Sequence, residues 1–169
     1  MNTLIDKQFE FNLWANTEII KLCTSLDETQ LSVEITGTFG DIRATISHMI
    51  QSEGIYLTDL GGEPLWPDDL DWHSISLSEL LGMAKQSGTA LRQVAISIDP
   101  NKTCEYTEDG KRNVFPAWVV INQAINHGIE HRTQLRLLLT KLAVPHPGQS
   151  VWGYAHSINA YQILDVYED

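Results

Sequence analysis

The segment 116–142 has the most regular helical pattern in the chain and does most to constrain its fold. Pro116 suits the first turn of a helix, and Pro145 and Pro147 end the pattern. One face of the expected helix is apolar: Val120, Ala124, Leu135, Leu138 and Leu142. A helix with one apolar face is stable mainly when that face packs against other elements. The segment therefore predicts a helical bundle.

Three further segments repeat apolar residues at three- and four-residue spacing. They predict one helix over residues 3–26, a second over 41–60, and a third that begins near Ser76 or Ser78 and ends before Asp99. Four long helices are enough for a four-helix bundle, and such bundles build metal sites from facing helices. We therefore expect an all-α fold.

The connections between the helices differ in kind. Residues 61–75 form a long connection rich in Pro, Asp and Trp, which we expect to pack through its own side chains. The extended segments 104–107 and 112–115 flank Asp109-Gly110, which is typical of a β-hairpin. The sequence thus predicts one small β-hairpin before the last long helix.

The chain is expected to form one domain over residues 1–169. Its aromatic tail, residues 150–169, is predicted to pack on the bundle with a short helix near 155–165.

The net charge excludes several kinds of partner. The 169 residues hold 11 Lys and Arg against 22 Asp and Glu, which gives a net charge of −11. Nucleic acids and anionic membranes need a basic surface, so we expect neither as a partner. No apolar run approaches the ~20 residues that cross a bilayer, and the first residues lack a signal-peptide pattern. With only Cys23 and Cys104, no disulfide framework is implied, and a reducing cytoplasm is expected.

Two histidines on the fourth helix are the first candidate site. His127 and His131 are four residues apart, so both side chains leave the same face of the helix, within its apolar stripe. This spacing lets two ring nitrogens bind one metal ion. The pair alone leaves two readings open: a metal site, or two histidines that are hydrogen-bonded in the core.

His48 is the third candidate ligand. It lies at the flank of the apolar stripe of the second helix, which suits a metal site that opens to solvent on one side. The other three histidines, His73, His146 and His156, lie in a loop, between prolines and in the tail, and we expect them at the surface.

Residues beside the histidine pair allow further readings. His127 to His131 also fit the H-x-x-E-H pattern of some zinc peptidases, in which Glu130 would act as general base, although a chain of this size has little room for a peptide cleft. Gln134, one turn beyond His131, is expected to face the pocket. For Arg132 we expect either binding of an anionic group or pairing with Glu130 or Glu28.

At this point the sequence resembles a known family. Residues 126–135, NHGIEHRTQL, resemble the H-x-x-x-H-R-x-Q motif of the DinB/YfiT-like metalloenzymes, and the resemblance covers about residues 1–150. Three other segments resemble the family pattern in the same order: Trp14–Asn16, Ser47–Ile50 with Glu53, and Val144–Pro147.

The resemblance implies an up-down-down-up four-helix bundle with a divalent metal, zinc or nickel, on His48, His127 and His131. It also implies a metal-dependent transferase that acts through a metal-bound low-molecular-weight thiol on an electrophilic substrate, often as a homodimer. Two alternatives stay open: a hydrolase that uses a metal-bound hydroxide, and a bundle that binds a metal or ligand without catalysis.

Overall fold

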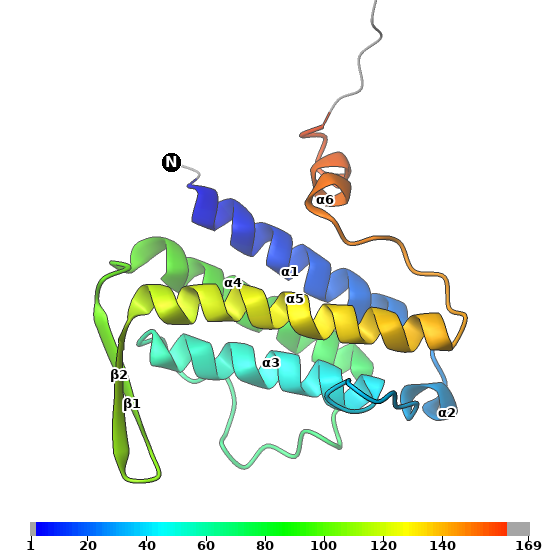
Figure 1. The fold of residues 1–169 in the computed structure, drawn as a ribbon, viewed down its shortest axis with the longest axis horizontal. Helices are drawn as coiled ribbons and strands as arrows, with labels where there is room; N and C mark the ends of the chain where they lie inside the picture. The colour runs from blue at the N-terminus through cyan, green and yellow to red at the C-terminus, as the bar shows by residue number, and fades with distance from the viewer. Residues whose placement is uncertain (1–2, 162–169) are drawn as a thin grey trace, which may run out of the picture.

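The computed structural model describes residues 3–161 and is dominated by four long helices (Figure 1). They are α1 (Leu4–Cys23), α3 (Ile42–Asp59), α4 (Leu77–Ser97) and α5 (Ala117–Lys141). α1 packs on α4 and α5, and α3 packs on the same two helices, so the four helices close a bundle. In Figure 1, α1 and α5 run in one direction while α3 and α4 run in the other. This confirms the predicted fold class and helix order.

The helices begin at the capping residues that the sequence offers. The side chain of Thr3 accepts a hydrogen bond from the backbone N–H of Asp6, and that of Asp41 accepts one from Ala44. Ser76 and Glu79 form a capping box at the start of α4. These bonds use backbone donors that the first turn leaves free. Pro116 has an extended conformation and precedes the first residue of α5, whereas the sequence predicted that it lies in the first turn.

The long connection 61–76 lets α3 and α4 run parallel, because it returns the chain along the whole bundle. As expected, it packs through its tryptophans: the rings of Trp66 and Trp72 meet edge to face at 5.6 Å and contact the apolar core. Gly54 of α3 makes room for this packing, since a Cβ there would lie 2.9 Å from the indole nitrogen of Trp66.

The predicted hairpin is present. β1 (Thr103–Glu108) pairs antiparallel with β2 (Lys111–Pro116), and Cys104 lies opposite Phe115. Asp109 and Gly110 at the turn have φ angles of 50° and 70°. This left-handed pair matches the twist of the strands. The hairpin lies against α3 and α5 at one end of the bundle.

A polar layer divides the core of the bundle. One apolar cluster includes Ile19, Ile46 and Leu135, and a second cluster includes Phe9 and Leu91. Between them each long helix contributes buried polar side chains: Asn12, Asn16, Glu53, Ser87, His127, His131 and Arg132. The candidate site therefore lies halfway along the bundle.

Residues 3–161 also include two short helices. α2 (Glu28–Leu31) lies between the first two long helices. α6 (Val151–Ser157) lies earlier than the helix predicted near 155–165, because the side chain of Ser150 caps it. α6 packs on α1, with the ring of Tyr154 5.5 Å from that of Trp14. The rest of the predicted tail, residues 162–169, lies outside the described residues.

No helix among residues 3–161 has the length and apolar character needed to cross a membrane.

Candidate metal centre

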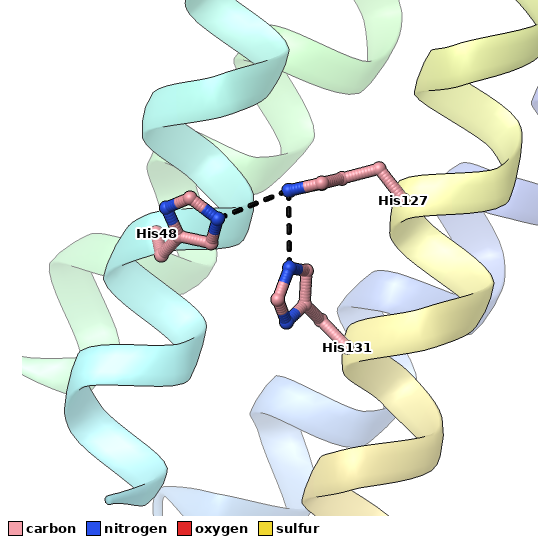
Figure 2. Close-up of side chains that lie close together, drawn as sticks. All are labelled: His48, His127 and His131. Atoms are coloured by element: carbon pink, nitrogen blue, oxygen red, sulfur yellow. Dashed lines mark hydrogen bonds between the residues drawn. The ribbon is translucent and has the colours of Figure 1, made fainter. Parts of the chain in front are cut away.

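The structure brings together the three histidines that the sequence singled out (Figure 2). His48 projects from the middle of α3, and His127 and His131 project from adjacent turns of α5. The Nε2 atom of His127 lies 3.1 Å from that of His48 and 3.0 Å from that of His131. One ring nitrogen from each residue lies within 4.8 Å of the others, so the group could hold a metal ion. His127 and His131 are buried and His48 is half-buried.

The other three histidines lie apart from this group. His73 and His156 are exposed, as predicted. His146 is half-buried, with its Nε2 atom 2.9 Å from the hydroxyl of Thr140.

Gln134 determines which nitrogen of His131 carries the hydrogen. Its side-chain oxygen accepts a hydrogen bond from the backbone N–H of Phe39 at 3.1 Å and lies 2.8 Å from Nδ1 of His131. Because an amide oxygen only accepts, Nδ1 of His131 must donate the hydrogen in this contact. Nε2 of the neutral ring then has a free lone pair, which faces His127. Gln134 thus faces the site, as the sequence predicts.

The three Nε2 atoms cannot all satisfy one another by hydrogen bonds. Because Nε2 of His131 has no hydrogen, its 3.0 Å contact needs a hydrogen on Nε2 of His127. With that hydrogen, Nε2 of His127 has no lone pair to accept from His48 at 3.1 Å. A divalent cation would instead take one lone pair from each ring, so this donor set fits a metal ion.

The surroundings keep two of the rings neutral. Burial lowers the pKa of His127 to about 4, and repulsion by His131 and His48 acts in the same direction. Burial also lowers the pKa of His48, helped by His131 and opposed by the negative charge of Glu130. Neutral imidazole is the form that binds a metal, so these rings need not lose a proton first at neutral pH.

Two aromatic side chains enclose the histidines. The ring of Phe39 stacks on that of His48 at 3.9 Å and meets His131 edge to face at 5.7 Å. The ring of Tyr56 meets that of His127 edge to face at 5.6 Å. These rings limit the access of water to the imidazole faces. Sequence reasoning missed Phe39, because its loop has no periodic pattern.

A network of buried hydrogen bonds lies beside the histidines. Glu53 accepts hydrogen bonds from Asn16 at 2.8 Å, from Asn12 at 3.3 Å and from Ser87 at 2.5 Å. Arg132 donates to the side-chain oxygens of Asn12 and Asn16 at 2.6 and 2.5 Å. The network joins all four long helices and holds the residue that follows His131.

Arg132 does not pair with either of the two carboxylates that the sequence suggested. It pairs with neither Glu130 nor Glu28, and Glu28 instead forms an ion pair with Arg43. Burial lowers the pKa of Arg132 to about 10, while the charge of Glu53 acts in the opposite direction. Its role is to link α5 to α1.

Glu130, the candidate general base, is exposed on α5. Its negative charge acts to raise the pKa of His48 and of Tyr56.

Comparison with known proteins identifies the family of the chain but no curated relative. None of the curated proteins matches the chain. The model of the DinB family, by contrast, matches residues 1–160. This stretch includes all four long helices and the three converging histidines, and the chain therefore belongs to the DinB family.

Proposed function

We propose that the protein binds one divalent metal ion, zinc or nickel, through Nε2 of His48, His127 and His131. The observation that supports this proposal best is the convergence of three ring nitrogens, whose lone pairs cannot all receive a hydrogen bond from one another. Gln134 supports the same assignment, because it holds the hydrogen of His131 on the nitrogen that faces away from the other rings.

We further propose a transferase that uses a low-molecular-weight thiol. Three protein ligands leave a fourth position on the ion, where a thiol or a water molecule loses its proton more readily. The overall reaction breaks the S–H bond of the thiol and forms a bond from sulfur to an electrophilic carbon. The leaving group departs from that carbon with its electron pair and takes up the proton that the thiol releases.

The protein's own cysteines are unsuited to supply this sulfur. Cys23 and Cys104 are both buried in apolar clusters, away from the histidines. Burial raises the pKa of the Cys23 thiol to about 12, so it stays protonated and unreactive at neutral pH. The nucleophile of such a transferase would therefore be a separate small molecule.

A hydrolase is the second candidate function, with Glu130 as its general base. Glu130 is exposed three residues after His127 on α5, and its charge acts on His48, so its carboxylate could accept a proton from an attacking water. The predicted homodimer and cytoplasmic location stay predictions.

Cobalt substitution tests both parts of the proposal. We expect the metal-free chain to bind about one Co²⁺ with the visible absorption of a four-coordinate ion. A small thiol such as 2-mercaptoethanol should then add a sulfur-to-cobalt charge-transfer band in the near ultraviolet. His48→Ala should lose most of the cobalt signal, whereas the matched control His73→Ala, at an exposed histidine, should keep it.

Three outcomes separate the candidates. Full cobalt binding by His48→Ala would contradict the three-histidine site. Cobalt binding without a thiol band would contradict the thiol transferase. Turnover of an ester without any thiol, lost in Glu130→Gln, would favour the hydrolase.

A further inference from the structure

A cavity lies between α3, α5 and the hairpin. Its volume is about 590 Å³, and its walls include Ile55, Tyr56, Asp59, Tyr106, Phe115 and Val119. None of the histidines is among its lining residues.

The cavity adjoins the histidine group along α5 and through Tyr56. Gln123, which also lines the cavity, precedes His127 by four residues. It therefore lies on the same face of α5, at a rise of about 6 Å. Tyr56 lines the cavity and its ring also meets that of His127 at 5.6 Å. A molecule in the cavity would thus be next to the candidate metal centre.

The walls of the cavity are mostly apolar and aromatic. Ile55 is 53% exposed, Tyr106 41% and Val119 36%, although all three are large apolar side chains. Tyr106 and Phe115 extend from the hairpin with their ring centres 5.7 Å apart. An apolar ligand group would cover this surface and remove it from water.

Asp59 is the acidic group of the cavity and has no cationic partner in the part of the chain that the structure describes. It is the last residue of α3, where the helix dipole disfavours negative charge and the last turn has no basic residue. It forms no ion pair or side-chain hydrogen bond within residues 3–161. Its carboxyl is half-buried, and burial raises its pKa.

A positive charge on the ligand would supply the missing partner. A cation beside Asp59 would offset both the burial of the carboxylate and the helix dipole. The faces of Tyr56, Tyr106 and Phe115 are also favourable surroundings for an ammonium group. The net charge of −11 would attract such a ligand from solution.

We propose that this cavity binds the electrophilic substrate of the metal centre, and that this substrate carries an apolar group and an ammonium group that pairs with Asp59. The inference rests on the proposed function, because it assigns the occupant of the cavity as the partner in that reaction.

Three probes that differ mainly in charge test the inference: 2-phenylethylamine, which is protonated at neutral pH, 2-phenylethanol and phenylacetate. Calorimetric titration of the metal-loaded protein should show the amine binding about tenfold more tightly than the alcohol. Phenylacetate should bind least. Equal affinities for the amine and the alcohol would overturn the inference.

Two variants locate the binding. Asp59→Asn should bind the amine and the alcohol alike, whereas Asp69→Asn, which removes the same charge from an exposed position, should keep the preference. Val119→Trp fills the cavity from a partly exposed position and should weaken binding of both probes without changing the metal content. An unchanged preference in Asp59→Asn, or unchanged binding in Val119→Trp, would overturn the inference.

The cobalt-loaded protein tests the link to the metal centre. The amine should perturb the visible cobalt spectrum, because Tyr56 contacts both the cavity and His127. Cobalt binding without any amine preference would overturn the inference and leave the proposed function standing. Failure to bind cobalt, with the amine preference retained, would overturn the proposed function and with it the assignment of this ligand as its substrate.

Discussion

Gln134 couples the candidate metal centre to the loop before α3, 95 residues earlier in the sequence. Its side-chain oxygen receives hydrogen bonds from His131 and from the backbone of Phe39, whose ring stacks on His48. One acceptor therefore helps to orient two of the three histidines. This makes Gln134 a positioning residue for the donor set.

Substitution of Gln134 should weaken metal binding without preventing folding. Gln134→Leu removes the acceptor, so the ring of His131 is free to rotate and to exchange its hydrogen between nitrogens. We expect metal affinity to fall about 10- to 100-fold, as is typical when such a partner is lost. Gln134→Glu keeps the acceptor and should bind nearly as tightly as the original protein. Competition with a chelator measures the metal affinity of both variants. Equal metal affinities for Gln134→Leu and the original protein would show that Gln134 does not position His131.

The sequence predicts the histidines better than their surroundings. The spacing of His127 and His131 is local, so the helical period is enough to place them on one face. Phe39 and the partners of Arg132 are long-range: Asn12 and Asn16 precede Arg132 by 120 and 116 residues. No local pattern carries that information, which is why the expected partners of Arg132 were wrong.

At the scale of elements, the best predictions were those with a local physical signal. The four long helices follow from apolar periodicity and capping side chains, and the hairpin follows from Asp109-Gly110 at its turn. α6 was misplaced because it is short and exposed, so no apolar period marks its bounds. Its start depends on a single cap, Ser150.

The close packing of α5 on α1 depends on Gly128. A Cβ at this position would lie 2.6 Å from the side-chain oxygen of Asn12 and 2.7 Å from a guanidinium nitrogen of Arg132. Both atoms belong to the buried hydrogen-bond network, so neither can move without breaking a bond.

Gly128→Ala should therefore destabilise the protein by about 1–3 kcal/mol, although alanine favours helix by about 1 kcal/mol. Gly82→Ala is the matched control, since Gly82 lies in α4 with nothing near its missing Cβ. It should leave stability equal or slightly higher. Urea unfolding measures both variants, and a Gly128→Ala protein as stable as the control would show that the two helices are less closely packed than described.

At the scale of the whole molecule, the polar layer makes stability depend on pH. Burial raises the pKa of Glu53 from 4.5 to about 7, although Ser87, Arg132, Asn16 and Asn12 all act to lower it. Between these pH values the folded protein holds a proton that the unfolded chain has released. The contribution of Glu53 to stability therefore falls as pH rises through this window.

His127 acts in the opposite direction. Its pKa falls from 6.5 to about 4 on folding, so between these values the unfolded chain holds a proton that the folded protein lacks. This contribution to stability rises with pH and is lost as pH falls. In the metal-free protein, the opposite effects of Glu53 and His127 on the pH dependence of stability partly cancel.

Glu53→Gln should remove the contribution of Glu53 to the pH dependence of stability and leave that of His127. The amide keeps partners for Ser87 and Asn16 but does not titrate, so stability of the metal-free variant should rise between pH 4.5 and 7 more steeply than that of the original protein. The difference should be at most about 3 kcal/mol across the window. Urea unfolding at several pH values in the presence of a chelator measures it. Parallel stability curves would show that Glu53 does not titrate in this range.

The position of His48 relative to His127 has a consequence for synthesis in the cell. The two residues are 79 positions apart, and the second one lies in the last long helix. A nascent chain that ends before residue 131 contains α1, α3 and α4 but not a complete set of three rings. Under the proposed function, loading of the centre with its ion therefore follows translation of α5, because the third ring is added only with residue 131.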